Sequence, residues 1–500
     1  MSTTGDITSL TRDSSLDGKS DSIPTLSNEA GATASTLSDN TWGYRLNNTG
    51  NFIPYVSGVQ IMEKSIATNA DTATLSFASK INYNKSAGSY AINLIFTGVS
   101  NPSTNYLYDT IASMSKGTQT VADLQAEITI PTSDDYTTDT SNSGVYEYDA
   151  TTFGAATDAS NDYKIYYYRG VLENSVGSYG SDGSAVTYPN YVRLGGNSTT
   201  STCWRILRTT GSGGVKMIYN GLWTGSTCAN ATTKAQHSFT GSAFDTSADS
   251  SSGQSIVGVG YMYNASYKST TTSTQAGTLF GTNSSFAGNT TKSTIKGKID
   301  TWYTSNLSTT YGSHLESSAG FCGDRSVNSG SSWTTYSDTT SITTPYRSGS
   351  SGSDATWFYF GSNRRNYSTA QTPSLGCPRS TVDLYTTSSA SNGNKKLTNP
   401  IALITADEAS FAGSGSSTAT KGSSYHTNSF LRSGAGFWLL SPSDRDSSAT
   451  ACVSYLGATG FLSRNNVTVA HGVRPAISLA QGTQISSGSG TATDPWEVTW

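Results

Sequence analysis

Two apolar runs near the C-terminal end of the chain enclose a polar segment, and this arrangement limits the folds that are open to it. Residues 436–442 form an aromatic and aliphatic run that stops at Ser441 and Pro442. Because proline cannot donate to a strand ladder, the run predicts a buried strand that ends there. Residues 473–477 predict a second strand, with Pro475 near its start or on an edge.

The polar segment between these runs, residues 443–471, alternates with the period of two that is typical of strands. The predicted inward set is Ala449, Ala451, Val453 and Tyr455, and the outward set is Thr450, Cys452 and Ser454. Short strands joined by glycine-containing turns therefore predict a rigid scaffold that offers mixed side chains to solvent. This is the layout of a recognition surface.

The frame formed by residues 437–442 and 472–479 is similar to the C-terminal end of C-type-lectin-like domains in surface proteins of Gram-positive and related bacteria. It also resembles the variable region of proteins that are diversified by retroelements, in which exposed positions of a lectin-like fold are changed. The resemblance implies ligand-contacting positions at Asp444, Arg445, Asp446, Ser454, Phe461, Arg464, Asn465, Asn466 and His471. The alternative is an ordinary polar β-meander without a special role.

Three further stretches carry the same resemblance. Residues 190–221 contain a Trp-Arg-Ile strand followed by a Gly-Val-Lys-Met-Ile strand, with a glycine-rich hairpin signal between them. Residues 401–408 are similar to another segment of the family, and Thr405 and Glu408 have the spacing of a capping box. Residues 42–102 resemble the small β-sandwich modules of these surface proteins.

The composition favours strands and loops over helices. Charged residues make up only 13%, while the chain contains 50 glycines and 29 tyrosines, and Ser, Thr, Asn and Gly are poor helix formers. We predict a mainly β fold with a few short helices (α+β), in which a small β-sandwich module precedes a C-type-lectin-like domain. The expected divisions are 1–40 (disordered tail), 41–102 (β-sandwich module), 103–160 (short helix and linker), 161–480 (lectin-like domain with long insertions) and 481–500 (closing strand).

The charge and hydropathy of the chain argue against nucleic acid as a partner and against a location within a membrane. The net charge is −4 and no basic run occurs, which argues against nucleic-acid binding. No stretch approaches 18 apolar residues, so no membrane span is predicted. The first residues lack a signal-peptide pattern. We therefore expect a mature or trimmed form of an extracellular or cell-surface protein, with export within a phage particle as the other route.

The five cysteines indicate disulfides rather than a metal site. None lies in a CxxC pair and the chain has only four histidines, so a structural zinc site is not expected. The hypothesis is two local bridges, with one cysteine left over. The bridges would join Cys203 with Cys228 and Cys322 with Cys377, leaving Cys452.

Two acidic pairs bear on catalysis. Asp324 beside Arg325 is typical of a pinned loop, and Asp407 with Glu408 is explained by helix capping. Neither a Gly-x-Ser-x-Gly motif nor a phosphate-binding loop is present. No enzyme activity, cofactor or metal is therefore predicted. The expected function is binding of a protein or glycan ligand, and the alternative is a structural subunit that self-associates into a fibre, a pilus-like appendage or a surface layer.

Local patterns predict further elements. Residues 106–114 and 293–303 have helical spacing, with Ser293 or Thr294 as the cap of the second. Residues 357–360, four consecutive aromatic side chains, predict a strand that leads into a polar loop.

Overall fold

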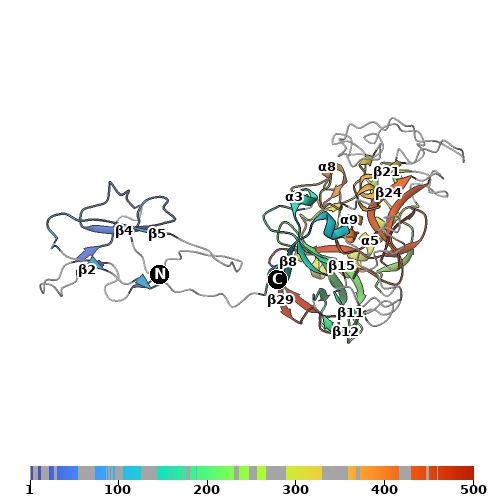
Figure 1. The fold of residues 1–500 in the computed structure, drawn as a ribbon, viewed down its shortest axis with the longest axis horizontal. Coiled ribbons are helices and arrows are strands. Elements are labelled where there is room, and N and C mark those ends of the chain that lie inside the picture. The colour runs from blue at the N-terminus through green and yellow to red at the C-terminus, as the bar shows by residue number, and fades with distance from the viewer. Residues whose placement is uncertain are drawn as a thin grey trace. The chain divides into compact units, whose positions relative to one another are not determined.

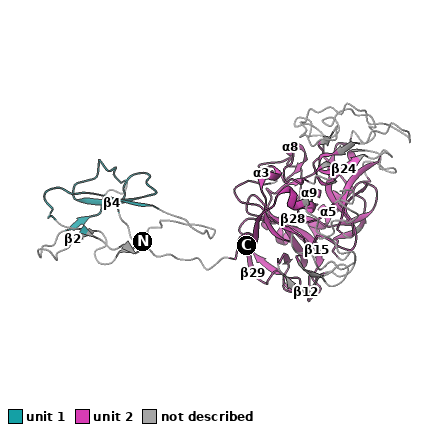
Figure 2. Ribbon diagram, viewed as in Figure 1, with its two compact units in different colours: residues 1–104 teal, residues 105–500 magenta. Residues whose placement is uncertain are grey.

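The computed structural model divides the chain into two compact units, residues 1–104 and 105–500 (Figure 2). It describes residues 2–3, 9–12, 22–27, 31–54, 74–85, 87, 90–91, 94–95, 105–125, 143–157, 159–170, 172–175, 181–186, 188–229, 236–246, 256–265, 289–328, 358–367, 372–415, 429–445, 450–458 and 460–500. Strands predominate and the helices are short, so the predicted mainly β fold class is confirmed (Figure 1).

The first unit is built around the antiparallel pair of β4 (Thr41–Leu46) and β5 (Leu75–Lys80). Trp42 and Tyr44 on β4 are buried, and Ile23 of β3 (Ser22–Pro24) packs against both. The other strands of this unit are β1 (Ser2–Thr3), β2 (Ser9–Arg12), β6 (Tyr90–Ala91) and β7 (Leu94–Ile95).

The segment expected to be a disordered tail, residues 1–40, contributes to the core of the first unit. Ile23, Leu26 and Leu37 are almost fully buried. Isolated apolar residues among many Ser and Thr give no periodic signal, but each occupies a separate site in this small core.

Among the described residues, the larger sheet of the second unit has ten strands. Seven follow one another in the order β23 (Ile401–Ala402), β28 (Ala476–Leu479), β15 (Val215–Leu222), β14 (Thr202–Thr209), β10 (Tyr166–Arg169), β9 (Gly144–Glu147) and β8 (Ser115–Thr118). In addition, β13 (Tyr191–Leu194) pairs with β14 and with β30 (Trp496–Thr499), which pairs with β29 (Gln484–Ser487). The closing segment 481–500 is therefore an integral part of this sheet.

The hairpin of β14 and β15 lies at the centre of the sheet, as the glycine-rich sequence between the strands predicts. Its turn closes with a hydrogen bond from Thr210 N to Gly214 O at 2.9 Å. Gly213 has φ +82°, a conformation that favours glycine. All eight residues of β14 are buried, which identifies it as a strand covered on both faces.

The second sheet contains the first part of the C-terminal frame, residues 437–442, and the start of its second part, residues 472–473. Its order is β16 (Phe239–Ser242), β27 (His471–Val473), β24 (Phe437–Arg445), β21 (Phe358–Phe360) and β20 (Val327–Asn328). The strands β25 (Ala451–Leu456) and β26 (Leu462–Asn466) continue from β24 as an antiparallel hairpin. The smaller ladders pair β11 (Glu173–Ser175) with β12 (Ser181–Val186), β17 (Met262–Tyr263) with β18 (Thr291–Lys292), and β19 (Phe321–Cys322) with β22 (Leu384–Tyr385).

The structure differs from both predicted strands of the frame: the first is longer than predicted, and the second is divided into two strands. β24 does not stop at Pro442 but continues to Arg445, with register shifts on either side of the proline that accommodate its missing N–H. The second predicted strand is two strands in different sheets, β27 and β28. The chain crosses between the sheets at Arg474 and Pro475, where the buried Arg474 guanidinium donates to Tyr219 O and Leu431 O.

The α-helices of the second unit are short. They are α1 (Leu107–Ser113), α2 (Val121–Gln125), α3 (Ala150–Phe153), α5 (Thr294–Asn306), α6 (Ser308–Tyr311), α7 (Gly361–Tyr367), α8 (Ser380–Asp383) and α9 (Ala406–Phe411), with 3-10 turns η2 (Ile256–Val259) and η5 (Gly312–His314). Ser293 caps α5 as predicted, because its hydroxyl accepts from Lys296 N. After Phe360 the chain forms α7 rather than the expected polar loop.

Candidate functional site

Eight of the nine predicted ligand positions fall on β24, the β25–β26 hairpin and β27. Asp446 lies outside the described residues, and of Arg445 the structure describes only the backbone. For the other seven, the register of the hairpin decides which side chains share a face. Cys452 lies opposite both Asp444 and Asn466, and Ser454 lies opposite Arg464.

Asp444 was predicted to be exposed, and this is wrong. Its side chain is fully buried and forms an ion pair with Arg464 from β26. The Arg464 side chain remains 31% exposed and also reaches Cys452 Sγ at 3.9 Å. Asp444 therefore neutralises and orients the Arg464 guanidinium from the buried side. Of these two side chains, only Arg464 is partly exposed and able to contact a ligand.

Ser454 and Cys452 were also predicted to face outward, and both are buried. The alternation of polar and apolar residues suggested one solvated face, but η2 packs against β24 and β25, and α9 packs against β25 and β26. Burial of both faces of β25 explains the error. An alternation of polar and apolar residues predicts an exposed face only where one side of the sheet meets water. The Ser454 hydroxyl has no hydrogen-bond partner among the described residues.

An aromatic cluster brings two predicted residues together with two that were not predicted. The His471 ring stacks on Tyr455 at 4.2 Å and meets the Trp438 ring edge-on at 4.7 Å. His471 Nε2 lies 3.1 Å from Asn465 Nδ2. Burial lowers the pKa of His471 to about 4, so the imidazole is neutral near pH 7.

Two further predicted residues lie at the two ends of β26: Phe461 directly before it and Asn466 as its last residue. Phe461 packs against Gly457, where a Cβ atom would come within 2.5 Å of the ring. A side chain at position 457 would therefore displace Phe461. Asn466 Oδ1 accepts from Thr468 N at 3.0 Å, which fixes the following turn. Both residues are half-buried.

We define the hairpin surface as the half-buried side chains Tyr455, Phe461, Arg464, Asn465, Asn466 and His471. Strand alternation places Arg464 and Asn466 on one face of the hairpin and Tyr455 and Asn465 on the other. Tyr455 was missed because its place in the alternation predicted an inward side chain. Each member has a packing or hydrogen-bonding partner that fixes it, so the surface is preorganised. Its charge is low, since Arg464 is paired and His471 is neutral.

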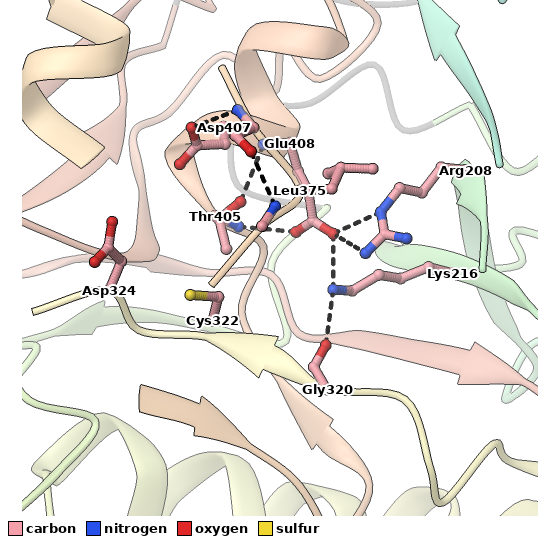
Figure 3. A pocket seen from close by; sticks show the side chains of 11 residues that line it. Arg208, Lys216, Gly320, Cys322, Asp324, Leu375, Thr405, Asp407 and Glu408 are labelled. Carbon is pink, nitrogen blue, oxygen red and sulfur yellow. Dashed lines mark hydrogen bonds and ion pairs between the residues drawn. The ribbon is translucent and has the colours of Figure 1, made fainter. Parts of the chain in front are cut away.

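A second cluster lies in the interior, where Glu408 of α9 meets two cations from the central hairpin (Figure 3). Glu408 Oε1 lies 2.8 Å from Arg208 Nη2 and 2.7 Å from Lys216 Nζ. Burial by itself raises the pKa of Glu408, but Lys216 and Arg208 outweigh it and lower the pKa to about 2. Glu408 also completes the predicted capping box with Thr405. It is therefore an ionised structural group at neutral pH.

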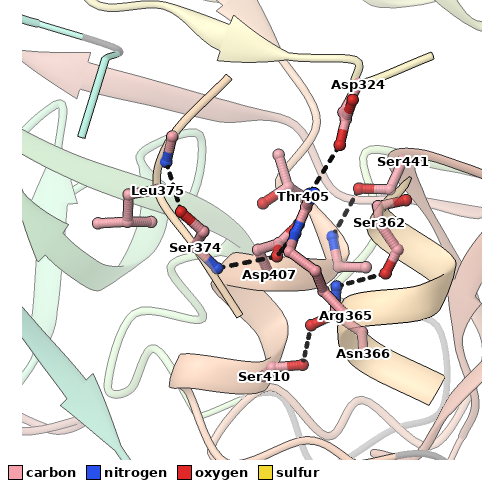
Figure 4. Close-up of polar contacts among 12 residues, drawn as sticks. Asp324, Ser362, Arg365, Asn366, Ser374, Leu375, Thr405, Asp407, Ser410 and Ser441 are labelled. Carbon is pink, nitrogen blue, oxygen red and sulfur yellow. Dashed lines mark hydrogen bonds and ion pairs between the residues drawn. The ribbon is translucent and has the colours of Figure 1, made fainter. Parts of the chain in front are cut away.

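Asp407, the other half of the predicted acidic pair, points to a different partner (Figure 4). Arg365 Nε donates to Asp407 Oδ1 at 2.8 Å, and Arg365 Nη2 lies 2.8 Å from Asp324 Oδ2. Ser374 N also donates to Asp407 at 3.0 Å. Asp407 and Glu408 are adjacent in the sequence but pair with different cations. Asp407 pairs with Arg365, while Glu408 pairs with Arg208 and Lys216.

A small cavity between these two charge clusters is lined by Arg208, Lys216, Asp324, Asp407 and Glu408, among others. Its volume of about 20 Å³ suits one water molecule and excludes a sugar ring. Short sequence patterns do not predict this network, because Arg208 and Lys216 are distant from Arg365 along the chain and all three look like ordinary polar residues of strands and loops.

The structure contains both disulfides of the sequence hypothesis. Cys203 bonds to Cys228 and Cys322 bonds to Cys377, while Cys452 is buried and unbonded to sulfur. Disulfides of this kind are compatible with an oxidising compartment. In the part of the chain that the structure describes, no group of three or more His, Cys, Asp or Glu side chains is placed to hold a metal ion. Within the same residues, no helix has the length and apolar character needed to cross a membrane.

No protein-family model, curated protein or solved structure matches the chain.

Proposed function

We propose that the chain is an extracellular ligand-binding protein that contacts a protein or a glycan through the hairpin surface. The observation that carries the proposal is the combination of partial exposure and fixed geometry at Phe461, Arg464, Asn465 and His471. Binding to side chains that are already ordered avoids much of the entropy cost of association.

Buried side chains behind the hairpin support this role because they hold members of the hairpin surface in place. The buried Asp444 holds Arg464, and the fully buried Trp438 supports His471. The low charge of the surface, with aromatic rings and amides, favours a neutral polar ligand over a strongly ionic one. On the resemblance to retroelement-diversified proteins, we further propose that the outward positions vary between copies of the gene.

The experiment is a screen of protein and glycan arrays with the full chain, followed by two single variants. Phe461→Ala and Asn465→Ala remove half-buried groups of the hairpin surface, and Ser305→Ala on the exposed side of α5 is the control for a substitution far from that surface. We expect at least a tenfold loss of affinity for the variants and no change for the control. Equal affinity of all four proteins for every captured ligand would reject the hairpin surface as the binding site.

Sequencing of the gene and its neighbours tests the variable character separately. A nearby reverse transcriptase gene and a near-copy of codons 437–475 that differs only at adenines would support it. Identical sequences in many isolates, with no such copy, would contradict it.

The second candidate is a structural subunit, and three exposed apolar side chains on the first unit favour it. Phe77, Ile81 and Tyr83 are 49%, 50% and 95% exposed, and Phe77 lies on β5, at the outer side of the β4–β5 pair. Apolar side chains beside a strand edge promote pairing with another chain. Electron microscopy of the purified protein distinguishes the candidates: fibres that disappear in a Phe77→Ser/Tyr83→Ser variant would favour a structural subunit.

A further inference from the structure

A lysine on α5 is buried in an unusual position. Lys296 is 0% exposed, and its Nζ lies 5.5 Å from the centre of the Tyr261 ring. Burial lowers the pKa of Lys296, although the neighbouring Asp300 opposes the shift. A lysine in such surroundings gives up its proton more readily than one in water, and the neutral amine is a nucleophile.

Asp300, one helical turn further along α5, connects this amine to a side-chain amide. Lys296 Nζ lies 3.1 Å from Asp300 Oδ1, and Asn399 Nδ2 donates to the same oxygen at 3.3 Å. Asn399 lies two residues before β23, which packs against α5, and the Asn399 carbonyl accepts from Ile401 N at 2.8 Å. One carboxylate therefore holds an amine and an amide from two different elements.

The residue after Asn399 removes the usual competing reaction. An asparagine side chain commonly loses ammonia when the backbone nitrogen of the next residue attacks it. That residue here is Pro400, which has no N–H. Asn399 is therefore protected from cyclisation and remains available to an external amine.

We propose that Lys296 and Asn399 form an intramolecular amide cross-link, with Asp300 as the proton-transferring group. Lys296 passes one proton to Asp300, Nζ forms a bond to Asn399 Cγ, and the Cγ–Nδ2 bond breaks. The proton held by Asp300 and a second amine proton both pass to the leaving nitrogen, which departs as ammonium. No atom is oxidised or reduced, so the reaction requires no further reactant.

The surroundings of the three groups favour this condensation. Asp300 is 7% exposed, which limits the access of water that would hydrolyse an intermediate. The Tyr261 hydroxyl is buried without a hydrogen-bond partner among the described residues. Asp300 contributes to raising the pKa of Tyr261, after the larger effect of burial, which places the two groups near each other.

The cross-link would join α5 to β23, the end strand of the larger sheet. It does not depend on the hairpin surface or on the proposed ligand.

Intact-mass spectrometry of the reduced, denatured full chain tests the proposal, together with peptide mapping. We expect the mass to be lower than the sequence mass by one ammonia, and a branched peptide that joins positions 296 and 399. Lys296→Met and Asn399→Ala should each restore the full mass. Lys292→Met is the matched control, because Lys292 contacts the same carboxylate at 2.6 Å but is 45% exposed, and it should retain the branched peptide.

Three results would overturn the proposal. The first is a full sequence mass after prolonged incubation at neutral pH. The second is an ammonia loss that maps to another asparagine, such as Asn392 before Gly393, where cyclisation is open. The third is a branched peptide that persists in Lys296→Met, which would assign the bond to a different lysine.

Discussion

Replacing Glu408 by glutamine measures how much the buried charge cluster contributes to the stability of the second unit. Glutamine keeps the shape of the side chain and serves at the third position of a capping box as well as glutamate does. The variant therefore removes the charge and leaves the cap of α9 in place. Arg208 and Lys216, which are 4% and 1% exposed, are left in the interior without their shared carboxylate.

The size of the effect follows from the pKa of Glu408. Its value falls from an ordinary 4.5 to about 2, a difference of about 2.5 units. At about 1.4 kcal/mol a unit, the folded state favours the ionised form by roughly 3 kcal/mol. This agrees with the 3–5 kcal/mol that removal of one partner from a buried ion pair typically costs. We therefore expect Glu408→Gln to lower the free energy of unfolding by about 3 kcal/mol.

The pH dependence has a defined sign. Because the folded-state pKa is lowered, the contribution of Glu408 is fully present above about pH 4.5 and is lost as the pH falls towards about 2. The difference in unfolding free energy between the wild type and Glu408→Gln should therefore shrink over that window. Comparing the two proteins cancels the titration of all other carboxylates.

Urea unfolding, followed by circular dichroism and tryptophan fluorescence, is the assay. Glu147→Gln is the matched control, because Glu147 pairs with Lys164 at the surface, where the two side chains are 26% and 65% exposed. This exposed pair should contribute less than about 1 kcal/mol. If the two variants lose the same stability, or if the loss in Glu408→Gln does not change between about pH 4.5 and about pH 2, the reasoning is refuted.

Three further predictions follow from the disulfides, the histidine and the core. Replacing Cys203 and Cys228 together by alanine opens a loop of 25 residues and should cost about 3 kcal/mol in urea unfolding; a loss below about 1 kcal/mol would show that the bond adds nothing. Because the pKa of His471 is lowered, the NMR chemical shifts of its ring should stay constant from about pH 8 to about pH 5. As the pH falls over that range, the wild type should lose more stability than His471→Gln, because the histidine gains a proton only in the unfolded state. A titration midpoint near 6.5 in the folded protein would contradict this. Trp438→Ala should cost about 3–5 kcal/mol, since the fully buried indole also donates to Ser242 O at 2.9 Å; near wild-type stability would argue against its burial.

Much of the local structure could be predicted from short patterns. The hairpin between β14 and β15, the cap of α5 at Ser293 and the capping box of Thr405 and Glu408 depend on residues only a few positions apart. Local backbone preference and side-chain capping decide such features, so neighbouring residues contain the information.

The candidate site was predicted only in part. Phe461 and the β26 residues Arg464, Asn465 and Asn466 are half-buried. Asp444 and other polar residues of the same segment are buried, because the alternation does not show which elements cover the second face. The ion pair of Asp444 with Arg464 is a contact across strands, which the sequence does not specify.

By itself, the sequence determined the mainly β fold class, since its strand-forming composition, its glycine turns and its apolar frame are local properties. Only the tertiary structure decided which polar residues are buried and with which partners they pair. Arg208, Lys216 and Glu408 come from positions up to 200 residues apart. A charge can be buried only where another part of the chain supplies its counter-charge, and that proximity exists only in the folded state.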